Sequence, residues 1–147
     1  MRLAQRLCDD MHGDLQEISA PTYQRPILGF MRAGYDSLTQ RRLPAAQPEP
    51  AIGGYARIVF CGPVWTSYPA APLRAFMQSQ QQWPETIGLF LTSGSHSPAE
   101  KAFELAQIDL GQPIDVMRSL PNSAENTTDE DRIIAEFSAA LEKAERS

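Results

Sequence analysis

Residues 55–76 read YARIVFCGPVWTSYPAAPLRAF, and this stretch changes character twice along its length. Its first part, 55–62, contains a continuous apolar run of the kind found in strands that are covered on both faces of a sheet. A proline-rich segment with the large aromatic side chains Trp65 and Tyr68 follows. Apolar residues at helical spacing begin at Pro72. The stretch therefore predicts a buried strand, a rigid loop and a helix in succession.

The alternation of strand and helix patterns continues through the whole chain. The predicted strands are 14–18, 55–62, 86–94 and 113–119. The predicted helices are one that starts at residue 1 or 2 and ends before Gly13, one at 27–38, one of two to three turns from 72, and those at 97–110 and 127–147. Strict alternation of this kind indicates a parallel sheet with helices on both of its faces. We expect 55–62 and 86–94, the most apolar strands, in the interior of the sheet. The more polar strands 14–18 and 113–119 belong near its edges.

Several helix ends carry capping signals. Gly13 stands where a left-handed residue would end the first helix. Ser97 is predicted to cap the helix at 97–110, and Glu100 would close a capping box with it. Thr128 together with Asp131 predicts the start of the last helix.

The composition is that of a globular protein. The chain has 147 residues, of which 42% are hydrophobic and 21% charged, and we expect one domain spanning 1–147. A formal net charge of −5 argues against a nucleic-acid partner, because phosphates are met by an excess of Lys and Arg. No apolar run approaches the roughly 18 residues that span a membrane, and the N-terminal residues MRLAQRLCDD carry acids, unlike a signal peptide. We therefore expect a cytoplasmic protein without a membrane partner.

Cysteine and histidine offer little chemistry. The two cysteines, Cys8 and Cys61, are too few for a disulfide scaffold, and with His12 and His96 they form no zinc-binding spacing. Cys61 ends an apolar run and is predicted to be a buried small hydrophobe. No Ser-His-Asp or Cys-His set can be assembled, so we predict no catalytic side chains and no metal site.

The segment GPVWTSYPAAPLRAF (62–76) is similar to the flavodoxin-like family of FMN-binding proteins, as are LGFMRAGYDSL (28–38) before it and LFLTSGSHSPAEKAF (89–103) after it. The resemblance covers roughly residues 3–141. It implies a doubly wound, three-layer α/β/α fold with a parallel sheet of strand order 2-1-3-4-5. In such a fold the cofactor lies at the carboxyl ends of the strands.

The resemblance also implies the residues of an FMN site. One side of the isoalloxazine ring would be flanked by Pro63, Val64, Trp65 and Thr66, with Tyr68 extending that wall. The other edge of the ring would be approached by Thr92, Ser93, Gly94, Ser95 and His96. A flat redox-active ring needs aromatic faces and fixed backbone hydrogen bonds, which such loops supply. The alternative for Trp65 is packing in a core or an interface, for Tyr68 it is a surface or interface position, and for His96 it is a solvated loop.

One part of the family pattern is missing. The family begins with a strand and a loop of the form T/S-x-T-G-x-T that holds the FMN phosphate, whereas the first helix here starts at residue 1 or 2 and no such loop occurs in the sequence. The absent strand is the central one of the order 2-1-3-4-5. Three outcomes are open: direct pairing of 14–18 with 55–62, a strand or cover from a partner subunit, or a longer natural protein.

These observations lead to two functional hypotheses. The first is an FMN-binding protein of redox or electron-transfer function with weakened or lost flavin affinity, which would act with a redox partner. If enzymatic, it would be an FMN-dependent oxidoreductase. The alternative is a cofactor-free flavodoxin-like domain that serves as a dimerisation or interaction module, since fold alone does not dictate function. We expect a homodimer.

Overall fold

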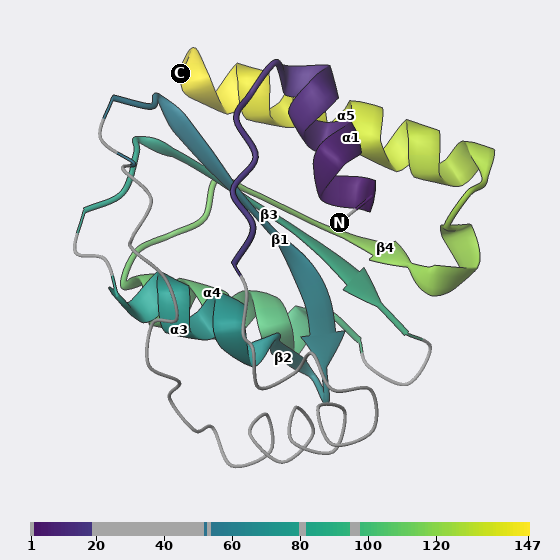
Figure 1. Ribbon diagram of the computed structural model, residues 1–147, viewed down its shortest axis with the longest axis horizontal. Coiled ribbons are helices and arrows are strands. Elements are labelled where there is room, and N and C mark those ends of the chain that lie inside the picture. Colours follow the sequence, from purple (N-terminus) through teal and green to yellow (C-terminus); the bar gives the residue numbers. More distant parts are fainter. Residues whose placement is uncertain (1, 19–51, 53, 80–81, 95–97) are drawn as a thin grey trace.

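The computed structural model describes residues 2–18, 52, 54–79, 82–94 and 98–147 (Figure 1). Its helices are α1 (Arg2–Met11), α3 (Ala71–Ser79), α4 (Glu100–Leu110) and α5 (Thr128–Glu145), with a short 3-10 helix, η2 (Asn122–Ala124). Its strands are β1 (Arg57–Trp65), β2 (Tyr68–Pro69), β3 (Thr86–Ser93) and β4 (Val116–Pro121). The predicted helix at 27–38 lies outside the described residues.

The strands form one sheet in the order β2-β1-β3-β4. β1, β3 and β4 are mutually parallel, which confirms the parallel sheet expected from the alternating pattern, while the two-residue β2 runs antiparallel to β1. β3 lies in the interior as predicted, and all of its residues except Thr92 are buried. β4 begins three residues later than the predicted strand and ends at Pro121.

Helices cover both faces of the sheet (Figure 1). α3 and α4 lie against one face, and α1 and α5 lie against the other. Because side chains alternate along a strand, Leu89 belongs to the core under α3 and α4, whereas Phe90 belongs to the core under α1 and α5. There the ring of Phe90 meets that of Phe137 of α5 edge-on, with the ring centroids 5.0 Å apart.

The predicted strand at 14–18 is wrong. These residues have no regular secondary structure, and Leu15 and Ile18 are 40% and 37% exposed. The two apolar side chains are three positions apart, so an extended chain would direct them to opposite faces and neither face would be apolar. The direct pairing of this segment with 55–62 is therefore wrong as well, since the structure pairs β1 only with β2 and β3 in the part of the chain that it describes.

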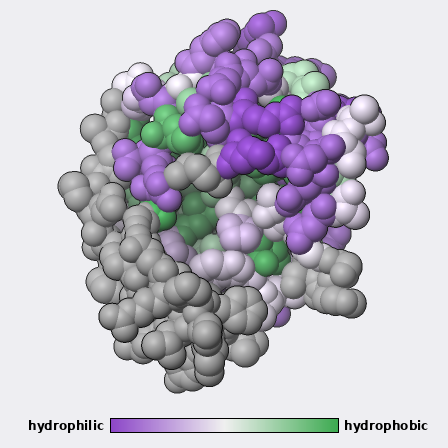
Figure 2. Space-filling view, turned by 45° about the vertical axis from the view of Figure 1, so that its right-hand side comes forward, coloured by the Kyte–Doolittle hydropathy of each residue, from purple (hydrophilic) through white to green (hydrophobic). Residues whose placement is uncertain are grey.

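β1 consequently has one paired edge along most of its length, where it lies beside β3. It pairs with β2 at Val64 and Trp65, so that from Arg57 to Pro63 no strand among the described residues pairs with its second edge. Val59 and Cys61 are accordingly only partly buried. On the face seen in Figure 2, hydrophobic residues (green) reach the surface below the hydrophilic side chains (purple) of the upper part. The prediction that 55–62 lies in the sheet interior thus holds on one side of the strand.

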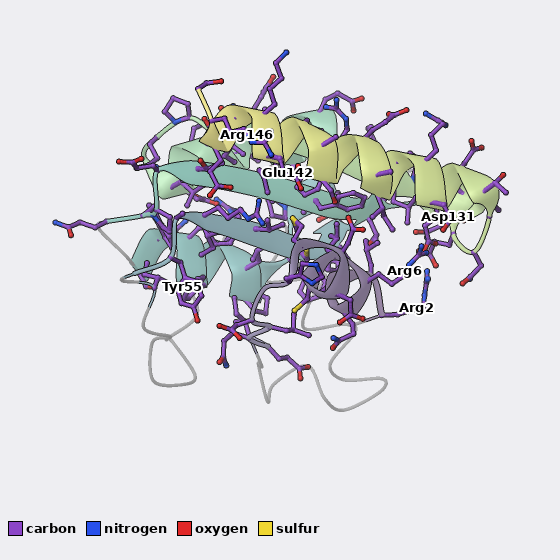
Figure 3. All side chains as sticks on the ribbon, turned by 90° about the horizontal axis from the view of Figure 1, so that it is seen from above. Arg2, Arg6, Tyr55, Asp131, Glu142 and Arg146 are labelled. Carbon is purple, nitrogen blue, oxygen red and sulfur yellow. The ribbon has the colours of Figure 1, made fainter. Side chains whose placement is uncertain are left out.

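α1 is held against α5 by apolar and polar side chains, and its Leu3 and Met11 are partly buried against the core under α5. Leu7 is 1% exposed and belongs to the core under α5. The Ser138 hydroxyl donates a hydrogen bond to Asp10 at 2.6 Å. Figure 3 shows Arg2, Arg6 and Asp131 gathered at the end of α5 where that helix begins. These contacts place the start of α1 beside the start of α5.

The helix caps differ in detail from the predictions. α1 ends in a left-handed residue, but that residue is His12, with φ of 51°, and Gly13 follows it and donates its N–H to the Cys8 carbonyl at 3.0 Å. α5 is capped by Thr127 rather than Thr128, because Thr127 has the extended backbone of a cap and its hydroxyl accepts from the Asp129 N–H at 3.2 Å.

α4 starts later than predicted. Its first residue is Glu100, and Ala99 occupies the N-cap position without a side-chain hydrogen bond. The predicted cap, Ser97, lies outside the described residues. The end of the helix is confirmed, since Gly111 has a left-handed φ of 72° and its N–H donates to the carbonyls of Gln107 and Ile108.

Candidate functional site

The two predicted ligand segments lie beside each other. β1 and β3 are parallel, and their register pairs Pro63 with Thr92 at the carboxyl end of both strands. The carboxyl ends of the two strands, and the segments that follow them, therefore lie at the same edge of the sheet. This edge is where open α/β sheets bind ligands. Of the second segment, Ser95 and His96 lie outside the described residues.

A third segment reaches this edge from β4. Pro121, its last residue, is paired with Ser93 of β3, and η2 follows directly. A Cβ atom added to Gly94 would lie 3.8 Å from the side-chain nitrogen of Asn122, which places η2 in van der Waals range of the chain after β3. The candidate site is thus bounded by three consecutive parallel strands.

The first segment is a strand and a hairpin rather than the predicted loop. Pro63, Val64 and Trp65 continue β1, and the chain turns back through Thr66 and Ser67 into β2. Pro63 has no N–H to offer a ladder, and prolines are tolerated at sheet edges for that reason. Its carbonyl oxygen accepts from the Ala70 N–H at 3.0 Å, which ties the two arms of the hairpin together.

The predicted site residues divide into interior and outward-facing side chains. Val64 and Ser93 are both 8% exposed, and Val64 belongs to the core under α3 and α4, so these two can offer a ligand only their backbone groups. Pro63 and Thr66 are exposed, and Trp65, Thr92 and Gly94 are half-buried. The geometry therefore brings an aromatic side chain, a hydroxyl and a glycine to one edge of the sheet.

Tyr68, the remaining predicted site residue, has its ring engaged by two helices. The Lys101 ammonium of α4 lies 4.6 Å from the ring centroid and 3.1 Å from the phenol oxygen. The Arg74 guanidinium of α3 lies 5.7 Å from the same centroid. Sequence reasoning did not identify Lys101, and its place in the first turn of α4 carries no motif that would have revealed it. Contact of Tyr68 with a flavin stays a prediction.

Arg74 is fixed by a buried carboxylate. Its guanidinium makes a two-pronged contact with Asp109 of α4, with N–O distances of 2.5 and 2.9 Å, and the Asp109 side chain is 4% exposed. The amide of Gln78 donates to the same carboxylate at 2.6 Å. Bidentate contacts of this kind hold a guanidinium in one orientation. α3 and α4 are thereby linked beneath the hairpin.

Charges also meet at the start of α1 and α5. Glu130 of α5 is fully buried and accepts hydrogen bonds from Arg2, Arg6 and the Asn126 N–H. The hydrogen bond from Arg2, more than any other contact, lowers the pKa of Glu130 to about 2, against the opposing effect of its burial. Arg6 also contacts Asp131 at 2.6 Å. Since these two arginines are committed to carboxylates, we assign the cluster to helix docking rather than to ligand binding.

Cys61 packs against a core as predicted, but it is only partly buried. It lies against the core under α1 and α5, and burial raises the pKa of its thiol to about 12. A thiol with this pKa is almost entirely protonated near neutral pH and is therefore a poor nucleophile.

Among the described residues, no group of three or more His, Cys, Asp or Glu side chains is arranged to hold a metal ion. Within the same part of the chain, no helix has the length and apolar character needed to cross a membrane.

Comparison with known proteins gives structural relatives but no sequence family. No family model matches the chain, and no curated protein matches it. A "putative flavoprotein" from Bacteroides eggerthii shares the fold with a TM-score of 0.70 at 19% identity, over 95% of this chain and 88% of that chain. A flavoprotein from Lactobacillus acidophilus, in complex with FMN, has a TM-score of 0.66 at 17% identity, over 93% of this chain and 89% of the other. The likeness shows an α/β fold shared with flavoproteins.

Proposed function

We propose that this chain is a flavodoxin-like flavoprotein that binds the FMN ring at the edge formed by 63–66 and 92–94. The observation that carries the proposal is the pairing of Pro63 with Thr92, which brings the two segments together at the carboxyl ends of adjacent parallel strands. The fold shared with an FMN complex supports it. In this proposal β1, β3 and β4 are the third, fourth and fifth strands of a three-layer fold with strand order 2-1-3-4-5. The first strand of that order is the missing one, and no strand in the second position lies among the described residues.

The residues at this edge fit a flat aromatic ligand. Trp65 offers an aromatic face, and the hairpin that carries it is tied by the hydrogen bond between Ala70 and Pro63. On the β3 side of the proposed ligand, Thr92 offers a hydroxyl and backbone groups, and Gly94 offers backbone groups without a side chain. Bound FMN would supply one- and two-electron transfer, and the chain would position the ring and shield one face of it from water. A redox partner would then exchange electrons at the exposed edge.

Flavin titration tests the proposal. Added FMN should change its visible spectrum and lose fluorescence as it binds, because stacking on tryptophan quenches the ring. Trp65→Ala should raise the Kd by about tenfold or more, since aromatic stacking on a flat heterocycle contributes roughly 1–3 kcal/mol. Tyr55→Ala is the matched control, because Tyr55 is 50% exposed and precedes the amino end of β1. Unchanged FMN spectra throughout a titration of the wild-type protein would reject the proposal, as would equal Kd values for the two variants.

We further propose that the ring contacts carry most of the affinity. The 147 residues contain no T/S-x-T-G-x-T loop, so this chain lacks the family's usual contacts to the phosphate. Riboflavin, which has the same ring without the phosphate, should then bind with a Kd within about threefold of that of FMN, a difference below 1 kcal/mol. A Kd for FMN that is a hundredfold lower than that for riboflavin would show instead that other residues hold the phosphate.

A second candidate function is a cofactor-free interaction module. The observation that favours it is the edge of β1 from Arg57 to Pro63, which no strand among the described residues pairs. Unpaired edges of this kind are templates for association with another chain. Light scattering distinguishes the cases, because a homodimer has twice the mass of the 16.3 kDa chain. A monomeric protein that binds FMN would reject the module, and a dimer that takes up no flavin would favour it.

A further inference from the structure

The hairpin at the candidate site contains a strained turn. Thr66 and Ser67 connect β1 to β2 and have φ values of 49° and 69°. Two-residue hairpins with positive φ at both central positions strongly favour Asn-Gly, because residues with a Cβ atom, and β-branched ones above all, are disfavoured there. The sequence thus places two unfavourable residues in the turn that carries Trp65. Such a turn persists only where its surroundings hold it in place.

The ladder of the hairpin is too short to hold this turn alone. Its register pairs Val64 with Pro69 and Trp65 with Tyr68, and beyond these pairs the Ala70 N–H donates to the Pro63 carbonyl. Two-stranded hairpins are at best marginally stable in water unless further contacts support them. Among the described strands, one arm of this hairpin, β2, borders β1 alone. Further support must therefore come from side chains of the hairpin that contact the rest of the molecule, those of β2 among them.

Beside Pro69, whose side chain is fully buried, Tyr68 provides part of that support. Its ring lies within 4.6 Å of the Lys101 ammonium and 5.7 Å of the Arg74 guanidinium, and Lys101 also donates to the phenol oxygen at 3.1 Å. Both cations belong to helices, and Arg74 is itself oriented by Asp109. A cation over a tyrosine ring and a charge-assisted hydrogen bond are both stabilising. The ring of Tyr68 is thus anchored to α3 and α4 by contacts that need no ligand.

We propose that Lys101 is a positioning residue: through Tyr68 it keeps the Thr66–Ser67 turn closed and so presents Trp65 in a fixed orientation. Tyr68 then acts on the site through the turn, independently of any contact between its ring and the ligand. The link to flavin affinity rests on the proposed function, whereas the closure of the turn does not. Fixing a binding segment before the ligand arrives reduces the entropy that is lost on binding.

Hydrogen exchange of the ligand-free protein tests the closure. In Lys101→Met the Ala70 N–H, which is bonded to Pro63, should exchange about tenfold faster, because a cation–π contact and a charge-assisted hydrogen bond are lost together. The matched control is Lys143→Met on α5, since Lys101 and Lys143 are the only lysines in the sequence and both variants lose one positive charge. Lys101→Arg, which keeps a cation at the ring, should restore slow exchange, and Tyr68→Phe should fall between.

Two results would overturn the inference. One is equal exchange of the Ala70 N–H in the Lys101→Met and Lys143→Met variants. The other is faster exchange of the buried Leu89 N–H of β3 in Lys101→Met, which would reveal general destabilisation rather than opening of the turn. FMN titration then extends the test: Lys101→Met should raise the Kd about tenfold, with recovery in Lys101→Arg. If the wild-type protein takes up no FMN, the proposed function fails while the exchange result still decides the role of Lys101.

Discussion

Arg2 of the N-terminal helix α1 is paired with Glu130 of the C-terminal helix α5. Both carboxylate oxygens of Glu130 accept hydrogen bonds from the Arg2 guanidinium, at 2.7 and 2.9 Å, although the residues are 128 positions apart in the sequence. Glu130 is fully buried at the start of α5, whereas the Arg2 side chain is 47% exposed at the start of α1. Because burying a carboxylate is costly unless it is paired, this contact makes the docking of α1 part of the stability of α5.

Replacing Glu130 by Gln should destabilise the protein. Arg2 would lose its anionic partner and Arg6 would keep only Asp131, and the free energy of unfolding should fall by about 2 kcal/mol, as for lost hydrogen bonds between charged groups. Urea unfolding, followed by circular dichroism, measures this change. The control is Glu136→Gln on the same helix, because Glu136 pairs with Arg132 where both side chains are more than half exposed. That change should stay within about 0.5 kcal/mol of the wild type, and an equal loss in both variants would contradict the role of Glu130.

The same pair predicts how stability depends on pH. The pKa of Glu130 is about 2 in the folded protein and near its ordinary value of 4.5 in the unfolded chain. Between these values the unfolded state binds more protons, so the contribution of Glu130 is fully present above pH 4.5 and is lost as the pH falls toward 2. Urea midpoints measured across this range should therefore converge for wild type and Glu130→Gln. A difference that stays constant down to pH 2 would exclude the pairing.

Gly88 of β3 is required for the close approach of α5. A Cβ atom at this position would lie 2.8 Å from the Phe137 ring and 3.0 Å from a methyl group of Leu141. Gly88→Ala should therefore lower the free energy of unfolding by about 1–3 kcal/mol, the usual cost of overpacking a core. Gly13→Ala is the control, because no atom lies within 4 Å of the added methyl group there. Thermal unfolding of the two variants checks the prediction, and a Gly88→Ala protein as stable as the control would contradict it.

Cys61 should be unreactive in the folded protein. Burial raises the pKa of its thiol to about 12, so very little thiolate is present at pH 8. In a Cys8→Ser variant, in which Cys61 is the remaining thiol, a disulfide reagent such as DTNB should react slowly in buffer and at once in concentrated urea. Rapid colour development without urea would show that the strand β1 exposes this residue to solvent.

Much of the fold could be predicted from local patterns. The unbroken apolar run at 86–94 predicted the interior strand β3, and Gly111 predicted the end of α4, because both signals depend on residues close together in the sequence. The wrong prediction of a strand at 14–18 also came from a local pattern. Leu15 and Ile18 were counted as apolar strand residues, but their spacing gave the segment no apolar face. The helix predicted at 27–38 and the domain boundaries stay predictions.

Only part of the arrangement at the candidate site could be predicted from the sequence. The pairing of Pro63 with Thr92 followed from adjacent parallel strands, so the two segments could be expected together. The inward side chain of Val64 could not, because the predicted loop at 63–65 continues β1, and strand alternation then decides which side chains face the core. Contact of these residues with a flavin stays a prediction.

The sequence by itself determined most of the alternation of strands and helices, and with it the parallel sheet whose carboxyl edge we propose as the ligand site. Periodicity and capping act over a few residues and are therefore readable along the chain. Only the tertiary structure decided that Glu130 meets Arg2 and that Lys101 meets Tyr68, 33 positions away. Such contacts depend on how whole elements pack, and neither partner carries a local signal of the other.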